Sequence, residues 1–136
     1  MKQTHRPIDT GVGELQGRTG IALDSFYFNM GTLSLELEGG FLPTHATSSA
    51  DEVGFKLIFA GLLAFQMIEL DTWESMLTSE DAGISSFDEV LNSEWLARMG
   101  GKASPKHKHY RLITYDYVID VICQWFELTT DKPSES

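Results

Sequence analysis

Short segments in which apolar residues alternate with other residues restrict the fold of this chain more than any other feature. The clearest is residues 53–59, where Val, Phe, Leu and Phe occupy every second position. Successive side chains of a β-strand point to opposite faces, so this spacing predicts a strand with one apolar face. The Ala-Gly pair at 60–61 favours a turn. Residues 63–70 place apolar side chains on both faces, which predicts a central strand of the sheet. This strand would complete a hairpin with residues 53–59.

A second alternating segment, residues 25–37, changes phase in its middle. Phe26 and Phe28 share one parity with Met30, whereas the leucines at 33, 35 and 37 share the other. Such a switch requires either a hairpin turn or a β-bulge in one long strand. We favour the hairpin, because Gly31 can adopt a positive φ at little cost.

Near the C-terminus, residues 110–114 and 117–128 are rich in aromatic and β-branched side chains. These residue types favour strands, with Tyr115 and Asp116 forming the turn between the two segments. A helix is the alternative for residues 117–128, because Val118, Val121, Ile122 and Trp125 also cluster at helical spacing. We choose the strand.

Helix start signals occur twice in the middle of the chain. Asp71 is followed three residues later by Glu74, the spacing of a capping box, and apolar residues follow at helical spacing. Ser86 and Glu89 repeat this spacing before a segment that Gly100 would end. The second helix could instead begin at Ser93 and leave residues 87–91 extended, and the sequence does not separate these two interpretations.

Together these segments predict an α+β, mostly β, fold. We expect a single antiparallel sheet of about six strands in sequential hairpins, with one or two short helices packed on it. The polar, glycine-rich residues 1–20 offer little to bury and predict a flexible N-terminal arm. Residues 21–128 would form the single globular domain, and residues 129–136 a frayed tail.

Charge restricts the partners. The 136 residues include 20 Asp and Glu against 10 Lys and Arg, a formal net charge of −10. Nucleic acids and anionic membranes are therefore excluded as expected partners, because a phosphate-backbone binder needs a basic footprint. A basic protein would be attracted to this surface, although acidic excess also serves solubility alone.

Cys123 is the only cysteine, so no internal disulfide can form, which fits a reducing compartment. The first residues lack the apolar stretch of a signal peptide, and no apolar run is long enough to span a bilayer. We therefore expect a cytoplasmic protein. The apolar neighbours of Cys123 indicate an inert core residue rather than a nucleophile.

Motifs for catalysis and cofactors are weak throughout. His107 and His109 form a His-x-His pair, but a zinc site needs a third ligand, and neighbouring cationic residues repel a dication. We interpret both as solvated histidines of an edge strand and expect no metal. The glycine spacing in residues 11–17 does not match a nucleotide-binding loop, so no cofactor is expected. Trp73, Trp95 and Trp125 occupy apolar-face positions and are interpreted as core.

Three fragments resemble small uncharacterised bacterial α+β proteins, some of them immunity proteins of polymorphic toxin systems. They are Val-Gly-Phe-Lys-Leu-Ile-Phe-Ala-Gly at 53–61, Asn-Ser-Glu-Trp-Leu at 92–96, and His-Tyr-Arg-Leu-Ile-Thr at 109–114 running into 116–121. The resemblance covers about half of the chain and includes no catalytic motif. It implies a non-enzymatic protein that blocks a toxin with an acidic face, and it transfers no functional residue.

Two functional hypotheses follow. The first is an acidic protein-interaction module, with Glu36, Glu38, Asp51 and Glu52 as binding residues because they flank the 41–50 loop. The second is a small-molecule-binding or enzymatic domain whose pocket is built from residues distant in sequence. In the second hypothesis the loops 41–52 and 101–108 would flank the pocket.

Overall fold

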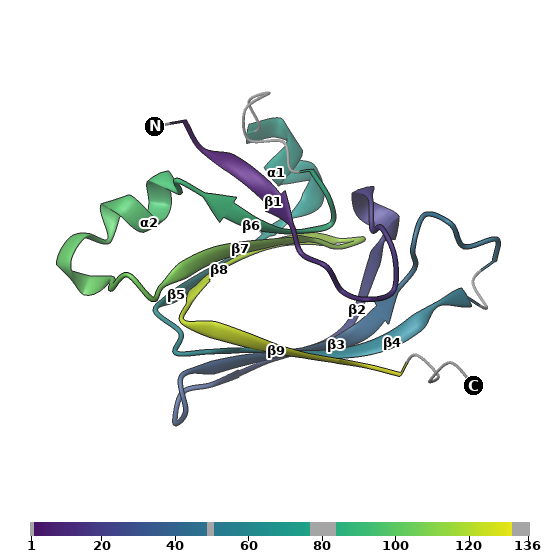
Figure 1. Cartoon of the computed structure of the whole chain (residues 1–136), viewed down its shortest axis with the longest axis horizontal. Helices are drawn as coiled ribbons and strands as arrows, with labels where there is room; N and C mark the ends of the chain where they lie inside the picture. The colour runs from purple at the N-terminus through teal and green to yellow at the C-terminus, as the bar shows by residue number, and fades with distance from the viewer. Residues whose placement is uncertain (1, 49–50, 77–83, 132–136) are drawn as a thin grey trace.

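Two antiparallel sheets, rather than one, form the protein in a computed structural model that describes residues 2–48, 51–76 and 84–131 (Figure 1). The five-stranded sheet has the order β1-β6-β7-β8-β5, and the four-stranded sheet has the order β2-β3-β4-β9. The strands are β1 (Thr4–Pro7), β2 (Ile21–Asn29), β3 (Ser34–Phe41), β4 (Val53–Ala60), β5 (Ala64–Glu69), β6 (Phe87–Leu91), β7 (Lys108–Ile113), β8 (Tyr117–Cys123) and β9 (Trp125–Thr130). The mostly-β α+β class is thus confirmed, and the single sheet is wrong.

Besides the link from β1 to β2, the described chain crosses from one sheet to the other at two adjacent points, β4 to β5 and β8 to β9, which explains the error. Strand β4 pairs with β3 and β9, whereas β5 pairs only with β8 among the described strands, so residues 53–70 do not form the expected hairpin. Gly61 makes the first crossing with a φ of 65°, and a Cβ there would lie 2.8 Å from the Gln124 side chain at the second crossing. Alternation shows which face is apolar, but it does not show which strand is the partner.

Segment 25–37 is a hairpin, as favoured, between β2 and β3. Gly31 does not take the positive φ; Leu33 does, at 50°. The side chain of Asn29 accepts hydrogen bonds from the backbone N–H groups of Gly31 and Thr32, which fixes the turn locally. A β-bulge also occurs, but earlier, between Leu23 and Ser25.

The C-terminal segments are extended, which confirms strand over helix for residues 117–128. Strands β7 and β8 form the predicted hairpin, whereas β8 and β9 belong to different sheets and separate at Gln124. Strand β5 is an edge strand with Gln66 and Met67 exposed, so its expected central position is wrong.

The main core fills the space between the two sheets. Phe59 of the four-stranded sheet contacts Phe87 and Tyr110 of the five-stranded sheet, at ring-centroid distances of 6.3 and 5.8 Å. Phe41 stacks on Phe55 at 4.1 Å. Cys123 is fully buried here, and burial raises the pKa of its thiol to about 12, as expected of an inert core thiol.

The first twenty residues were expected to bury little apolar surface, yet they contribute to the five-stranded sheet and to the main core. Strand β1 pairs with β6, and Val12 and Leu15 are buried in the main core. At the other end, Thr129 and Thr130 belong to β9, and residues 132–136 lie outside the described part of the chain.

Both α-helices lie on the outer side of the five-stranded sheet, away from the main core (Figure 1). Helix α1 (Leu70–Met76) is the first predicted helix, and it packs Leu70 and Trp73 against Val118. Helix α2 (Glu94–Arg98) begins after the N-cap Ser93, so the later start is correct and residues 87–91 form strand β6. In the described residues neither helix reaches the length needed to cross a bilayer.

Candidate functional site

A cleft of about 400 Å³ opens on the outer face of the five-stranded sheet, between α1 and α2. Its walls include Trp73 and Met76 from α1, and Trp95 and Arg98 from α2. The cleft volume lies within the range of ligand pockets, about 300–1,000 Å³. Neither the 41–52 loop nor the 101–108 loop lines it, so the expected flanking loops are wrong, although the lining residues are indeed distant in sequence.

Polar side chains from four neighbouring strands form the cleft floor and its continuation. Asp88 on β6 pairs in register with Arg111 on β7, Arg111 pairs with Asp120 on β8, and Asp120 pairs with Gln66 on β5. Residues directly opposite in adjacent strands share a face, so these four side chains form one row across the sheet. The first three are buried, at 1%, 8% and 1% exposure. We call these four residues the polar row.

Asp120 is the most heavily bonded member of the polar row. Its Oδ1 accepts hydrogen bonds from Arg111 Nε at 2.8 Å and from His109 Nε2 at 2.6 Å. Burial acts to raise the pKa of Asp120, but the hydrogen bond from His109 and the Arg111 charge outweigh it and hold this pKa below its ordinary value of 3.8. Asp120 is therefore a buried carboxylate whose charge is compensated by its neighbours.

The orientation of His109 follows from its two partners. A carboxylate only accepts hydrogen bonds, so Nε2 carries the proton that is donated to Asp120. In the neutral imidazole Nδ1 is then an acceptor, and the Ser93 hydroxyl donates to it at 2.7 Å. Ser93 Oγ in turn accepts from the Leu96 backbone N–H at 3.1 Å as the N-cap of α2. One chain of hydrogen bonds thus ties α2 to the polar row.

Ser93, His109 and Asp120 have the residue types of a hydrolase triad, but their placement favours a structural role. Ser93 is only 6% exposed and is not among the residues that line the cleft, whereas a nucleophile must reach a substrate. Its oxygen is also engaged by the helix N-terminus. We therefore interpret the trio as the support of the cleft floor.

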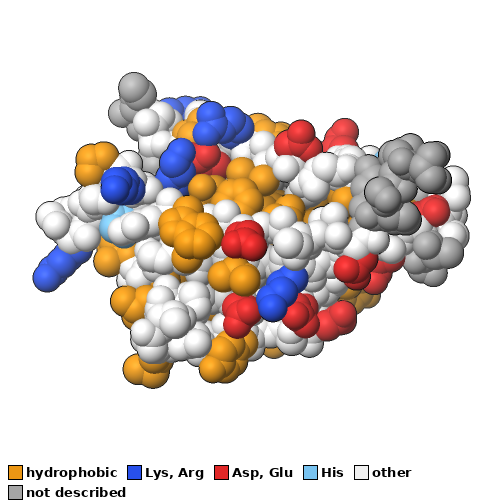
Figure 2. Space-filling model, turned by 60° about the horizontal axis from the view of Figure 1, so that its bottom comes forward, with side chains coloured by type: hydrophobic (Ala, Val, Ile, Leu, Met, Phe, Trp, Pro, Cys, Tyr) orange, Lys and Arg blue, Asp and Glu red, His pale blue; other side chains and the backbone are white. Residues whose placement is uncertain are grey.

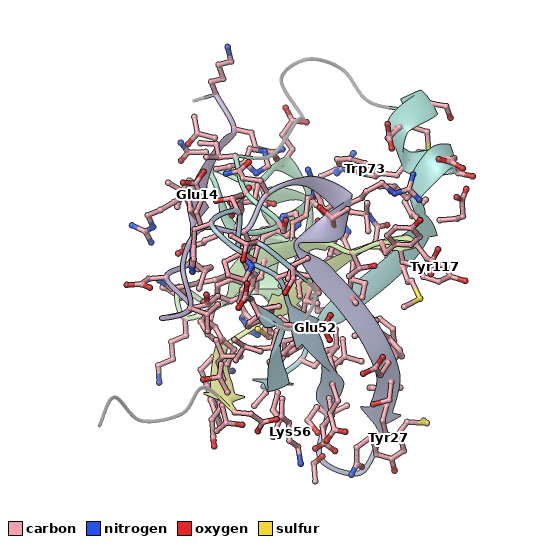
Figure 3. All side chains as sticks on the ribbon, turned by 90° about the vertical axis from the view of Figure 1, so that its right-hand side faces the viewer. Glu14, Tyr27, Glu52, Lys56, Trp73 and Tyr117 are labelled. Atoms are coloured by element: carbon pink, nitrogen blue, oxygen red, sulfur yellow. The ribbon has the colours of Figure 1, made fainter. Side chains whose placement is uncertain are left out.

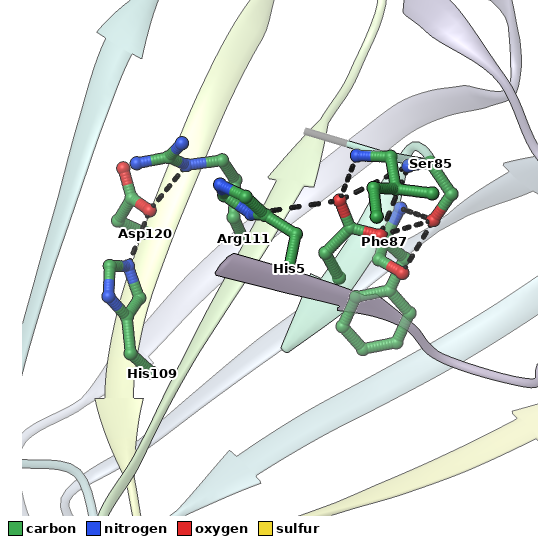
Figure 4. A network of polar contacts seen from close by, with 8 residues as sticks. His5, Ser85, Phe87, His109, Arg111 and Asp120 are labelled. Carbon is green, nitrogen blue, oxygen red and sulfur yellow. Dashed lines mark hydrogen bonds and ion pairs between the residues drawn. The ribbon is translucent and has the colours of Figure 1, made fainter. Parts of the chain in front are cut away.

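His5 on β1 extends the buried cluster toward Asp88 (Figure 4). Its Nδ1 lies 3.9 Å from Asp88 Oδ2, beyond hydrogen-bond distance, and neither ring nitrogen has a hydrogen-bond partner among the described residues. Burial, together with the nearby Arg111 charge, lowers the pKa of His5 below 6.5. Asp88 itself accepts hydrogen bonds from the Ser85 hydroxyl and backbone N–H, which fixes the start of β6.

The tryptophans do not share the core position expected of them. Trp73 is buried, but on the outer face, where the Arg111 guanidinium lies 5.3 Å from its ring centroid. Trp95 is half-buried and contacts His109 edge-on at 5.4 Å. Trp125 is 53% exposed on the outer face of the four-stranded sheet, so its core assignment is wrong. Two of the three indoles thus line the cleft.

The four acidic candidates do not form one group. Glu36 and Glu38 share the outward face of β3, where Glu36 forms an ion pair with Lys56 at 3.4 Å. Asp51 instead accepts hydrogen bonds from the Thr47 and Ser48 backbone N–H groups, which lower its pKa and close a turn.

Glu52 lies over the same face of the four-stranded sheet as Glu36 and Glu38. Gly40 follows these two residues at every second position of β3, so a Cβ there would point to their outward face. A Cβ added at Gly40 would lie 2.2 Å from Glu52 Oε1, so this side chain covers the Gly40 backbone. Lys56 and Tyr27 point outward from the four-stranded sheet, well away from Trp73 and the cleft (Figure 3). Three of the four acidic candidates, Glu36, Glu38 and Glu52, therefore lie on one face, and their role in binding stays a prediction.

The two histidines of the His-x-His motif have different environments. His109 is 3% exposed on β7, the central strand of its sheet, so the expectation of a solvated edge-strand histidine is wrong for it. Both of its ring nitrogens are engaged by Ser93 and Asp120. His107 precedes the strand, and its Nδ1 accepts a hydrogen bond from the Ser104 backbone N–H.

The sequence did not indicate that Gln66, Arg111 and Asp120 belong to one site. A usable signal existed: Arg111 and Asp120 are single charged residues inside otherwise apolar strand segments. Their pairing depends on the register of β7 and β8. Comparisons with protein-family models, curated proteins and solved structures found no match to this chain.

Proposed function

We propose that the protein binds a small polar molecule in the cleft between α1 and α2. The observation that carries this proposal is the polar row beneath two tryptophans. Helices packed on a sheet normally cover apolar side chains, and burying ionised groups costs free energy unless each is paired. Arg111 and Asp120 occupy buried strand positions where apolar residues would cost less free energy. Both residues also border an open cleft.

The composition of the cleft matches that of a binding pocket. Apolar contact area comes from Trp73, Trp95 and Ile68, and a few convergent polar groups come from the sheet. The polar groups stand on strands rather than loops and are held by hydrogen bonds, so they are preorganised. This proposal develops the second hypothesis drawn from the sequence.

A thermal-shift screen of polar metabolites tests the proposal. A ligand that binds only the folded state stabilises it by about RT ln(1 + [L]/Kd), so a hit raises the melting temperature. We expect hits whose shift disappears in W95A and Q66A and persists in Y27A, the control on the opposite sheet. A library without hits, or hits that W95A and Q66A leave unchanged, would contradict the proposal.

Protein interaction through the four-stranded sheet is the second candidate function. No described helix covers the outer face of this sheet, where Tyr27 and Trp125 are 57% and 53% exposed. Figure 2 shows this side of the molecule, where orange hydrophobic and red acidic side chains lie among one another. Exposed aromatic residues are frequent interface anchors, and Glu36 and Glu127 share one outward row with Tyr27. A basic toxin or other basic protein is the proposed partner.

Charge reversal separates this second function from the first. The double variant E36K/E38K should slow association with a basic partner at low salt, because charges near an interface mainly change the association rate. Asp51 should be left unchanged in this test, since it closes a turn. Capture of a partner whose association rate is unaffected by the double variant would contradict a role for this face.

A further inference from the structure

We infer that the ligand of the cleft is an uncharged, hydroxyl-rich molecule of the saccharide class. This inference rests on the proposed binding function and specifies its ligand. Three properties of the described lining residues support it: their charge balance, their hydrogen-bonding groups and the position of Trp95.

The charges around the cleft are balanced. Glu94 and Asp120 supply two carboxylates, and Arg98 and Arg111 supply two guanidinium groups. Asp120 and Arg111 also neutralise each other directly, with 2.8 Å between Oδ1 and Nε. A site for a phosphate or another anion requires surplus cations, and a site for an amine requires surplus carboxylates. The described lining offers neither surplus, which selects a ligand without net charge.

The hydrogen-bonding groups on the floor suit hydroxyls. Asp120 Oδ1 is occupied by two donors, but Oδ2 receives only a long contact, 3.4 Å from Gln66 Nε2, among the described residues. Gln66 adds an amide with both donor and acceptor atoms, and Gln3 adds another whose oxygen accepts from the Glu94 backbone N–H. A hydroxyl donates one hydrogen bond and accepts up to two. Adjacent hydroxyls of one ligand can therefore form hydrogen bonds with the carboxylate and with the amides at the same time.

Trp95 supplies an apolar surface beside these polar groups. Its ring is half-buried, with His109 against it edge-on at 5.4 Å, and it remains part of the cleft wall. The electron-rich face of an indole attracts the weakly positive C–H groups of a saccharide ring, while the ring hydroxyls stay free for polar partners. The second indole of the cleft, Trp73, already has the Arg111 guanidinium over its ring. Trp73 is therefore less suited than Trp95 to stack on a ligand, including a flat aromatic one.

Titration calorimetry with defined sugars tests the ligand class. The probes are D-glucose, D-galactose, D-mannose, N-acetyl-D-glucosamine and their disaccharides, with D-glucuronate, D-glucosamine and adenosine as comparison compounds. We expect at least one neutral sugar to bind, and its charged analogue to bind about tenfold more weakly. W95A and Q66A should each weaken the binding of that sugar about tenfold, whereas Y27A should leave it unchanged.

The outcomes separate this inference from the broader proposal. Binding of adenosine or a charged comparison compound in preference to every neutral sugar, with loss in W95A, would overturn the saccharide class and retain the cleft as a binding site. A lack of binding by every sugar would also overturn the saccharide class. Failure of the metabolite screen as well would overturn the binding function itself. Should W95A fail to fold, Q66A gives the same test, because Gln66 is exposed on an edge strand.

Discussion

Arg111 and Asp120 face each other across β7 and β8, with 2.8 Å between Arg111 Nε and Asp120 Oδ1, on the side of the sheet that faces away from the main core. Both are buried, and they join the floor of the cleft to His109. The ion pair therefore contributes both to the stability of the fold and to the shape of the candidate site. Its two effects are separable by experiment.

Loss of the Asp120 charge should destabilise the protein strongly. D120N leaves the buried Arg111 guanidinium without its carboxylate and weakens the bond to His109, and breaking a buried pair costs roughly 3–5 kcal/mol. The free energy of unfolding from urea titration measures this loss. E127Q, at an exposed position on β9, is the control and should change it little. Equal stability of the two variants would show that the pair contributes nothing.

Acid should destabilise the wild type through the same carboxylate. The pKa of Asp120 is lower in the folded protein than its ordinary value of 3.8, so its stabilising effect is complete above that pH and is lost as the pH falls through the folded value. The unfolding free energy of D120N should thus decline less steeply below pH 3.8 than that of the wild type. Parallel declines would contradict the lowered pKa.

His5 should make stability depend on pH in a higher range. Its folded pKa lies below the ordinary 6.5, so the unfolded chain binds the proton more readily and stability falls as the pH drops from 6.5 toward the folded value. The groups that act on it are Asp88, Arg111, His109 and Asp120. In stability measurements across this range, H5Q should lack part of the decline, whereas H45Q, at an exposed histidine, should retain it. A decline that H5Q leaves intact would exclude His5 as its source.

Ser93 should matter for stability through two bonds at once. S93A removes the N-cap of α2, worth about 1 kcal/mol, and leaves His109 Nδ1 buried without a donor, worth about 1–3 kcal/mol. S104A is a matched control, because Ser104 contacts His107 Nδ1 in an exposed loop. Urea titration should show a much larger loss for S93A than for S104A, and similar losses would refute the buried chain of bonds.

Phe59 and Trp125 should differ in their contribution to the core despite similar apolar character. Phe59 is fully buried between the sheets, so F59A should cost roughly 3–5 kcal/mol of unfolding free energy. Trp125 is 53% exposed, and W125A should stay within about 1 kcal/mol of the wild type. Comparable losses on thermal or urea unfolding would place Trp125 in the core after all.

The sequence predicted local structure better than the arrangement of the elements. Residues 53–59 and 117–123 are strands because alternation and β-branched side chains act locally. Their assignment to different sheets depends on the crossing at Gly61 and Gln124, where the chain turns without interrupting the apolar pattern. A hairpin and a crossing between sheets therefore look alike in the sequence.

The candidate site was hidden for a related reason. Gln66, Arg111 and Asp120 come together through the registers of three strands, and one of these, β5, joins the sheet beside β8 rather than beside its neighbour in the chain. The net charge instead favoured acidic residues such as Glu36 and Glu38 as binding residues. Net charge describes the whole surface, so it does not locate a pocket. An immunity-type role remains a prediction.

Two-dimensional NMR of the three indole N–H groups tests the central claim, ligand binding in the cleft, most directly. Trp73 and Trp95 line the cleft, whereas Trp125 lies on the outer face of the opposite sheet, so the protein carries two reporters and one internal control. Single Trp→Phe variants assign the three signals. Titration with the strongest hit of the metabolite screen should shift the Trp73 and Trp95 signals and leave Trp125 in place. Shifts confined to Trp125, or no shift of any indole signal, would contradict the account.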